Sequence, residues 1–501
     1  MSLLSRKKTG KKNISTKDLY FGMPEAEGEN LAGFSLIDYF EDFLDVLSYL
    51  EKGKFIFVGR KGVGKSAIAK YIKDTSDNSD ASSAHILRIS DLNAEKFIQS
   101  CAGVKNIEVL LFEWLILVNI IKLVIREERG KYTKEYGKLK TFLERNTGTV
   151  DIDKFQVDEI LQKKGGEVSF EVLTHVFDGI FKKYFDVRTK KAPFYKLIPP
   201  LKEVLKIILD YDVNKDFEFW LLFDDLDIDY DIKNEKDNNS ILELLRIAKI
   251  YNNEVFKYNK AKILVFIRDD VRNNIISRYA DSAKIFNSYE IFIDWYNNNE
   301  FDNPLKKLAN KRIEKTFLEH NLRFEKDAWD SLFKQNDWKS SFKQILDYTF
   351  YRPRDIITFL SIVSENDFSI PLNISDTETI LNKYIQKNVA EIKSELSLYF
   401  NTEEKDILFK KLFHYIAYTN NVKYKDVLSK IGEFFVQKDS QTIFDILRGY
   451  SLLVLKSPSG DLFFNYRDDI IKSNIDDYNI VLPKCLYHYY KPLLKTYDKI
   501  S

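Results

Sequence analysis

The stretch of sequence that decides the fold is Gly59-Arg60-Lys61-Gly62-Val63-Gly64-Lys65-Ser66. It matches the pattern G-x-x-x-x-G-K-[ST], the phosphate loop or P-loop, at every fixed position. The apolar run at residues 54–58 has the length of a buried strand, and the spacing of apolar residues over 67–72 is helical. A chance glycine-rich turn is the plain alternative. The strand before the motif and the helix after it favour a phosphate-binding loop.

The chemistry of such a loop explains its residue types. Glycines let the backbone fold around a polyphosphate, so that N–H groups and a helix N-terminus point at its oxygens. The Lys65 ammonium would neutralise charge on the β and γ phosphates, and the Ser66 hydroxyl would ligate Mg²⁺. The sequence therefore predicts a nucleotide-binding segment made of Gly59, Arg60, Lys61, Gly62, Val63, Gly64, Lys65, Ser66 and Ala67.

A second motif follows the apolar run at 219–223, which ends in Asp224-Asp225-Leu226-Asp227. Carboxylates at the carboxyl end of a parallel strand lie at the ligand-binding edge of the sheet. We expect Asp224 to orient Mg²⁺ through its water shell, and Asp225 to polarise the attacking water as the catalytic base. The alternative is an ordinary acidic loop, because seven acids lie between Asp224 and Asp237.

The other apolar runs predict the sheet. Residues 85–89, 263–267 and 289–293 read as strands that alternate with helices, which indicates a parallel α/β sheet covered on both faces. One run lies between the two motifs and another follows the acidic one. This order fits the ATPases that insert a strand between the P-loop strand and the acidic strand, rather than the kinase-like division.

Composition sets the limits of these predictions. At roughly 150 residues per domain, a chain of 501 residues suggests about three domains. With 77 Lys+Arg against 76 Asp+Glu, no bulk charge attracts nucleic acid or an acidic membrane surface. Hydrophobic residues at 44% exclude a globally disordered chain, and only 18 glycines and 10 prolines favour long helices.

Localisation is predicted from what the sequence lacks. Cys101 and Cys485 form no disulfide framework, which indicates a reduced, cytoplasmic protein. The basic start of the chain is not followed by the apolar region of a secretory signal. The most apolar stretch, residues 109–125, contains Glu113, Asn119 and Lys122, so we expect a buried core helix and no membrane partner.

The expected domain organisation has four parts. They are a basic tail and lead-in at 1–30, a P-loop core at 31–300 with a helical insertion at about 95–215, a helical lid and linker at 301–386, and a winged-helix-like domain at 387–501.

The expected winged helix consists of helices at 404–418, 423–435 and 440–450, followed by strands at 452–456 and 462–466. The third helix carries one base, Arg448, and one acid, Asp445, whereas a phosphate-binding face needs several unpaired Lys or Arg. We therefore favour packing or oligomerisation over DNA reading for this domain. The basic tail at 1–17 and the segment 126–145, with seven Lys/Arg against four Glu, are the stronger DNA candidates.

The acidic motif at 224–227 resembles that of the STAND, KAP and origin-recognition-like ATPases related to AAA+ proteins. Three more segments resemble a bacterial group of P-loop ATPases, many of them encoded near phage-defence genes. These segments are Tyr20-Phe-Gly-x-x-x-Ala26-Glu27-x-Glu29, Ile267-Arg-Asp-Asp-Val271 and Tyr351-Arg-Pro-Arg-Asp355. The resemblance covers about residues 18–365, and it leaves two roles open for the segment around Tyr20, adenine contact or docking.

The resemblance also implies roles for arginines. Arg268 would be a sensor-1-like contact to the γ-phosphate, and Arg354 (or Arg352) a sensor-2-like residue that reaches the nucleotide from the lid. Each has a structural alternative, a surface or lid-packing arginine. Arg272 and Arg278 are candidates to complete the site of a neighbouring subunit. Many hydrolytic relatives have Glu where this chain has Asp225, which implies slow turnover or turnover confined to an assembly.

The function that these features predict is an AAA+/STAND-like switch or motor that binds ATP with Mg²⁺ and hydrolyses it to ADP. The resemblance connects it with anti-phage defence, self-association and a partner effector protein. Two alternatives stay open: a DNA-binding initiator or loader resembling origin-recognition proteins, and a nucleotide-dependent scaffold with negligible turnover.

Overall fold

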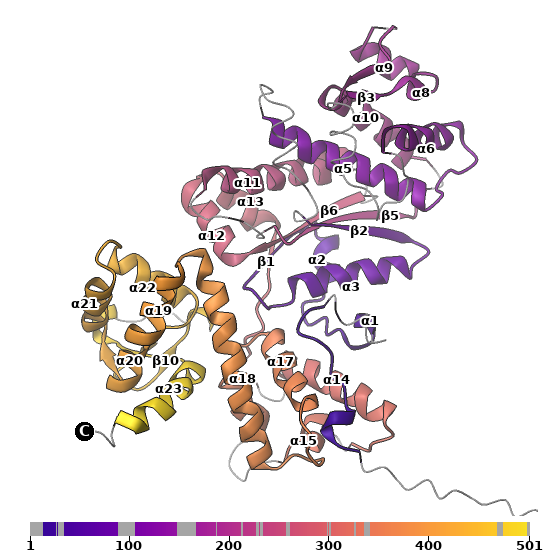
Figure 1. Ribbon diagram of the computed structural model, residues 1–501. Coiled ribbons are helices and arrows are strands. Elements are labelled where there is room, and N and C mark those ends of the chain that lie inside the picture. The colour runs from indigo at the N-terminus through magenta and orange to yellow at the C-terminus, as the bar shows by residue number, and fades with distance from the viewer. Residues whose placement is uncertain are drawn as a thin grey trace, which may run out of the picture. The chain divides into compact units, whose positions relative to one another are not determined.

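The computed structural model describes most of the chain, in two compact units (Figure 1). The described residues are 14–26, 28, 35–88, 106–147, 167–186, 188–211, 214–226, 230, 234–256, 261–297, 299, 302–324, 327–334, 341–467 and 474–497. One unit is Asp42–Ile293, and the other joins Met1–Glu41 to Asp294–Ser501. Each unit has its own core.

The first unit is built on a five-stranded parallel sheet. Its strands are β1 (Ile56–Gly59), β2 (Ser82–Arg88), β5 (Glu218–Asp224), β6 (Ala261–Arg268) and β7 (Glu290–Phe292). The order across the sheet is β2-β5-β6-β1-β7, so β6 lies between the P-loop strand and the acidic strand, as the sequence predicts. All five predicted strands are present, and the largest difference is at β2, which begins at Ser82 rather than at residue 85.

Helices cover both faces of this sheet, which is why its strands are apolar throughout. Helix α3 (Lys65–Asp77) lies on one face, and α5 (Ile107–Arg126) and α11 (Glu235–Ile250) lie on the other (Figure 1). All eight residues of β6 are buried, and the ring of Phe57 stacks on that of Phe266 at 4.6 Å.

The prediction of a buried core helix at 109–125 is confirmed. Asn119 and Lys122 of α5 are both fully buried, and the Asn119 side chain donates a 2.8 Å hydrogen bond to the Leu115 carbonyl. Among the described residues, no helix is long and apolar enough to cross a membrane.

The predicted helical insertion also contains a small sheet, which the sequence analysis missed. Strands β3 (Glu167–Ser169) and β4 (Lys191–Pro193) pair antiparallel. The helices around them are α6 (Lys134–Thr147), α8 (Glu171–Thr174), α9 (Asp178–Tyr184) and α10 (Phe194–Leu209). Three-residue strands carry too little alternation to be recognised, which is why the segment reads as helical. Residues 95–105 and 148–166 of the insertion lie outside the described residues.

The second unit begins with the lead-in segment, which packs on lid helices. These helices are α14 (Pro304–Glu319), α15 (Ala328–Leu332), α16 (Ser341–Leu346), α17 (Pro353–Ser364) and α18 (Ile374–Glu395). Thr16 is buried and its N–H donates to the Phe368 carbonyl at 3.0 Å, while Arg312 donates to the Phe21 carbonyl at 2.9 Å. The end of the predicted basic tail at 1–17 is therefore packed on the lid at Thr16, and residues 1–13 lie outside the described residues.

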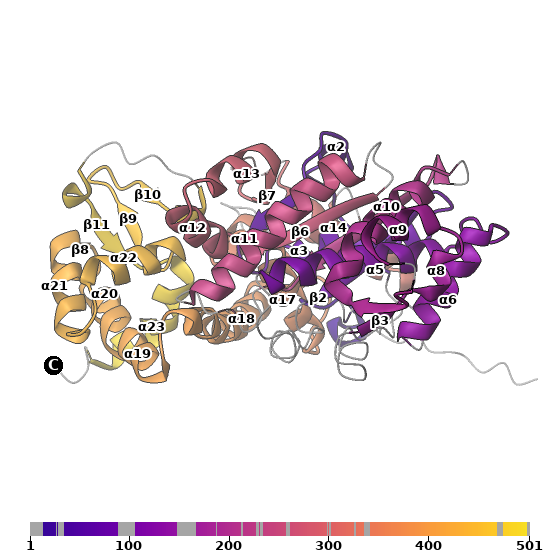
Figure 2. The ribbon, with the colours of Figure 1, turned by 90° about the horizontal axis from the view of Figure 1, so that it is seen from above.

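The C-terminal module of the same unit has the predicted order of helices and strands (Figure 2). Its elements are α19 (Thr402–Ile407), the π-helical η9 (Leu408–Leu412), α20 (Phe413–Thr419), β8 (Val422–Lys423), α21 (Tyr424–Phe434), α22 (Ser440–Gly449), β9 (Val454–Lys456), β10 (Leu462–Phe463), β11 (Asn479–Val481) and α23 (Lys484–Tyr497). The hairpin β9–β10 belongs to an antiparallel sheet of order β10-β9-β11-β8. The sequence analysis missed β8 and β11, because these strands are two and three residues long.

Candidate nucleotide-binding site

The backbone of the P-loop explains its glycines. Gly62 and Gly64 have φ of +82° and +95°, a backbone conformation that residues with a Cβ rarely adopt. Gly64 is also the N-cap residue of α3. At Gly59 a Cβ would lie 2.7 Å from Val63 Cγ2 and 3.2 Å from the Ile293 carbonyl oxygen. Steric constraints on the backbone therefore explain why both fixed positions of the motif, 59 and 64, are glycine.

Lys65 is held against the loop that precedes it. Its Nζ donates hydrogen bonds to the carbonyl oxygens of Gly59 at 2.9 Å and Arg60 at 3.2 Å. The ammonium therefore lies beside the backbone of the loop, at the N-terminus of α3, where an anion is favoured.

The two residues predicted to bind Mg²⁺ lie together. Asp224 ends β5, is 2% exposed, and accepts a hydrogen bond from the Ser66 hydroxyl. Burial raises the pKa of Asp224, while the Ser66 hydrogen bond and the nearby Lys65 charge act in the opposite direction. Its Oδ2 has no hydrogen-bond partner among the described residues. A buried carboxylate oxygen without a partner beside a hydroxyl fits a small, oxygen-seeking cation such as Mg²⁺.

Asp225, the predicted base, is paired with an arginine that sequence reasoning missed. Asp225 has φ of +54°, which is unusual for a residue with a side chain, and its Oδ2 lies 3.3 Å from Arg88 Nε. Arg88 ends β2, in register with Asp224 of the adjacent β5. The available signal was a basic residue at the carboxyl end of a predicted strand, the edge at which ligands bind.

Arg268 ends β6 in register with Gly59 of β1, so its backbone lies beside the start of the P-loop. The side chain is 6% exposed, and its Nε donates to Asp270 Oδ1 at 3.1 Å. Burial raises the pKa of the neighbouring Asp269, whereas Arg60, Lys65 and Arg268 lower it. A carboxylate close to the charges of Arg60 and Lys65 is a second site feature that the sequence analysis did not single out.

Arg352 and Arg354, the two candidates for a nucleotide contact from the lid, differ in how far they are buried and in their ion pairs. Arg352 is 4% exposed and is bound by two carboxylates, with Nη2 2.9 Å from Asp355 Oδ1 and Nη1 2.9 Å from Glu395 Oε1. Arg354 is partly exposed and forms one ion pair, Nη1 to Glu391 Oε1 at 2.7 Å. The contacts of Arg352 hold α17 to the end of α18, which leaves Arg354 as the candidate for a nucleotide contact.

The two candidate arginines of α12 (Asp269–Arg278) differ in the same way. Arg272 forms a two-point ion pair with Glu290, each contact at 2.7 Å. Arg278 is exposed at the end of the helix and donates to Asn274 Oδ1 at 3.0 Å. Arg278 is therefore the better candidate to serve a neighbouring subunit.

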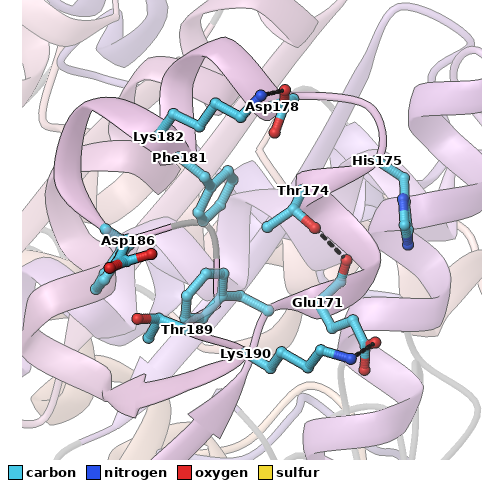
Figure 3. Close-up of a pocket in the computed structure, with 11 residues that line it drawn as sticks. Glu171, Thr174, His175, Asp178, Phe181, Lys182, Asp186, Thr189 and Lys190 are labelled. Carbon is cyan, nitrogen blue, oxygen red and sulfur yellow. Dashed lines mark hydrogen bonds and ion pairs between the residues drawn. The ribbon is translucent and has the colours of Figure 1, made fainter.

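A cavity of about 440 Å³ lies in the insertion, away from the P-loop (Figure 3). Phe170 and Phe181 stack at 5.2 Å in its lining, and two ion pairs lie around it, Lys182 with Asp178 and Lys190 with Glu171. It shares no residue with the P-loop or with the acidic motif.

Three features define the architecture of the core. They are a glycine-rich loop after β1, an acidic motif at the end of β5, and β6 inserted between these two strands. The core has the fold of a P-loop ATPase. The predicted fold class, an α/β P-loop core with a parallel sheet, is confirmed, and a helical C-terminal domain follows it.

A comparison with protein-family models matches part of the lid. The family described as "FunZ-associated C-terminal helical domain" matches residues 303–371, which span α14 to α17. No curated protein matches the chain.

Three solved structures resemble this chain with low sequence identity and low TM-scores. The ORC2 protein of Aeropyrum pernix in its ADP form is 11% identical, with 90% of this chain and 92% of that chain covered and a TM-score of 0.33. The same protein in ADPNP–ADP complexes is 10% identical over 97% and 99%, with a TM-score of 0.38. CDC6P from Pyrobaculum aerophilum is 10% identical over 90% and 91%, with a TM-score of 0.32. TM-scores below 0.5 establish no common fold, so the assignment rests on the strand order and the loop.

Proposed function

We propose that this protein binds ATP and Mg²⁺ and hydrolyses ATP as an AAA+-like switch or motor. The observation that supports it is the convergence of Lys65, Ser66 and Asp224 from two elements at the carboxyl edge of the sheet. Such a site suits a triphosphate, whose charge needs a cation, a hydroxyl and a carboxylate within a few ångströms of one another.

Each residue has a distinct role in this proposal. Residues 59–67 bind the phosphates, with Lys65 as the positive charge. Ser66 and Asp224 hold Mg²⁺, which would neutralise charge on the phosphates. Asp225 accepts the proton of the attacking water, and Arg268 stabilises the charge that develops on the γ-phosphate. ADP leaves, and the next ATP enters.

The test compares two substitutions in the site with one outside it. Lys65→Ala should abolish ATP binding or turnover, because the loop backbone alone cannot offset the triphosphate charge. Asp225→Asn should retain binding and stop phosphate release, because the amide keeps the shape and loses the base. Lys73→Ala, which removes a partly exposed lysine of α3 paired with Asp77, is the control and should match the wild type.

Equal phosphate release from the wild type, Lys65→Ala and Asp225→Asn would contradict the proposal. Tight ATP binding by the wild type without phosphate release would favour the scaffold with negligible turnover.

The proposed organisation keeps the four sequence-defined parts, with residues 387–501 as a winged helix used for packing or self-association. Arg278 would then complete the site of a neighbouring subunit, and Arg354 would reach the nucleotide from the lid. A partner effector and a role in anti-phage defence, in the cytoplasm, complete the proposal. They rest on the resemblance of the sequence motifs.

The DNA-binding initiator is the second candidate, and one observation favours it. Tyr132 is 97% exposed in the turn between α5 and α6, and Lys131, Lys134 and Lys140 of the same basic segment are also exposed. Solvent-exposed aromatic rings beside lysines suit base stacking and phosphate contact. Helix α22, in contrast, has only Arg448 as a base.

A salt titration of DNA binding distinguishes the two DNA surfaces. If the insertion binds DNA, replacing the three lysines with Gln should reduce the magnitude of the slope of log affinity against log salt, by about 0.9 for each phosphate that the variant no longer neutralises. Substituting Arg448 should leave that slope unchanged. DNA-stimulated ATP hydrolysis would promote the initiator to first place.

A further inference from the structure

An arginine of the C-terminal module lies in a cage of aromatic rings. Arg467 closes η10 (Asn465–Arg467), just after β10. Its guanidinium carbon lies 4.3 Å from the ring centroid of Phe464, 4.9 Å from Tyr296, 5.6 Å from Tyr351 and 5.6 Å from Tyr466. Its Nε has no hydrogen-bond partner among the described residues. The positive charge is therefore held mainly by ring faces, an arrangement that strengthens as water is excluded.

The rings come from three separate parts of the chain. Tyr296 precedes the lid helices, Tyr351 belongs to the lid, and Tyr466 belongs to the C-terminal module. Their centroids are 5.1 Å apart for Tyr296 and Tyr351, and 5.5 Å apart for Tyr351 and Tyr466. One cluster thus joins the entry to the lid, the lid itself and the C-terminal module, all within the same unit.

Tyr351 connects this cluster to Arg352 and Arg354, which follow it in the sequence. It is 1% exposed, has φ of +56°, and its hydroxyl accepts a 3.0 Å hydrogen bond from Lys343. A residue with a side chain stays in the left-handed region only where its surroundings hold it there. The next residue is the N-cap of α17, and Arg354 lies in the first turn of that helix. The cage therefore fixes the chain directly before Arg354, which is partly exposed.

We infer that Arg467 is a positioning residue through which the C-terminal module sets the orientation of Arg354. Arg467 holds Tyr351, Tyr351 fixes the start of α17, and the start of α17 carries Arg354. This inference rests on the proposed function, because the role of Arg354 in ATP binding belongs to that proposal. Any partner that pulled residues 464–467 away from Tyr351 would change the response to ATP without touching the nucleotide.

The experiment is a double-mutant cycle in the full-length protein, read as the KM and kcat of ATP hydrolysis. Arg467→Gln removes the cation and should raise the KM for ATP about three- to thirty-fold, the range of one or two cation–π contacts. Arg354→Ala should raise it at least as much. If Arg467 acts through Arg354, Arg467→Gln should have no further effect in the Arg354→Ala background.

Two further variants keep the test decisive. Arg467→Lys retains a cation in the cage and should restore most of the affinity for ATP, so that a folding defect in Arg467→Gln does not obscure the result. Lys410→Gln removes an exposed charge of the same module, paired only with Asp406, and should behave as the wild type.

Additive effects of Arg467→Gln and Arg354→Ala, or an Arg467→Gln enzyme with the wild-type KM, would overturn the inference and leave the proposed function intact. A wild-type protein that neither binds nor hydrolyses ATP would overturn both. Failure of Arg467→Lys to restore the KM would also count against the inference, because the cage would then not act through its charge.

Discussion

Helices α12 and α17 both begin directly after an arginine, but the two arginines have different surroundings. Helix α12 starts after Arg268 and α17 after Arg352, and each arginine is an extended N-cap residue. Each also pairs with an aspartate in the first turn of its helix, Arg268 with Asp270 and Arg352 with Asp355. The local sequences are therefore alike in chemistry.

The surroundings of the two arginines separate their roles. Arg268 stands next to the P-loop strand, and its neighbour Asp269 responds to the cations of the loop. Arg352 has a second carboxylate, Glu395 of α18, and both of its partners are buried. An arginine enclosed by two carboxylates holds helices together, whereas an arginine at the ligand edge of a sheet can serve a ligand. The place of each arginine in the fold therefore indicates its role.

The largest difference that we expect between variants of these arginines is in the stability of the protein. Arg352→Ala leaves Asp355 and Glu395 buried without their cation, which should lower the free energy of unfolding by about 3–5 kcal/mol. In a unit of this size that corresponds to a thermal midpoint lower by roughly 10 °C. Arg354→Ala is the matched control, because its partly exposed pair contributes about 1 kcal/mol or less. Equal midpoints for the two variants would mean that Arg352 is not structural.

The second effect is on catalysis. Arg268→Ala should lower kcat for ATP hydrolysis about 10²–10³-fold, the cost of removing one donor that stabilises charge in a transition state. ATP binding should change little, and the thermal midpoint should fall less than in Arg352→Ala. Steady-state phosphate release and calorimetric ATP binding measure the two quantities. A variant with normal kcat and a large loss of stability would place Arg268 in the same class as Arg352.

The smallest effect concerns Arg88, which sharpens the picture at the ligand edge. Its ion pair with Asp225 is partly exposed, and such pairs contribute about 0.2–1 kcal/mol. Arg88→Ala removes one cation from beside the Asp225 carboxylate, which should then accept the proton of the attacking water more readily, so kcat should rise by up to about five-fold. Lys73→Ala again serves as the control. A fall in kcat would show that Arg88 assists turnover instead of competing for the base.

Much of the fold follows from local sequence. The glycines of the P-loop are needed by the backbone itself, since Gly62 and Gly64 have positive φ and Gly59 has no room for a Cβ. The strands of the parallel sheet are near-continuous apolar runs, because helices bury both of their faces. The smaller strands β3, β4, β8 and β11 were missed, because two or three residues give no periodicity and their partners lie far away in sequence.

The candidate site divides along the same line. Lys65, Ser66, Asp224 and Asp225 were predicted from motifs, since each motif sets its residues at the end of a strand or the start of a helix. Arg268 was predicted from the family resemblance, and it ends β6. The pairing of Arg88 with Asp225 was not predictable, because it joins the ends of two strands separated by the whole insertion.

The sequence by itself determined the phosphate loop, the acidic strand and the inserted strand of the sheet, because these depend on backbone conformation and on runs of apolar residues. Only the tertiary structure decided which arginine is enclosed and which is available. Arg352 is held by Glu395, Arg272 by Glu290 and Arg467 by rings from three parts of the chain. An arginine has the same charge in every context, and its role is set by the groups that folding brings within a few ångströms of it.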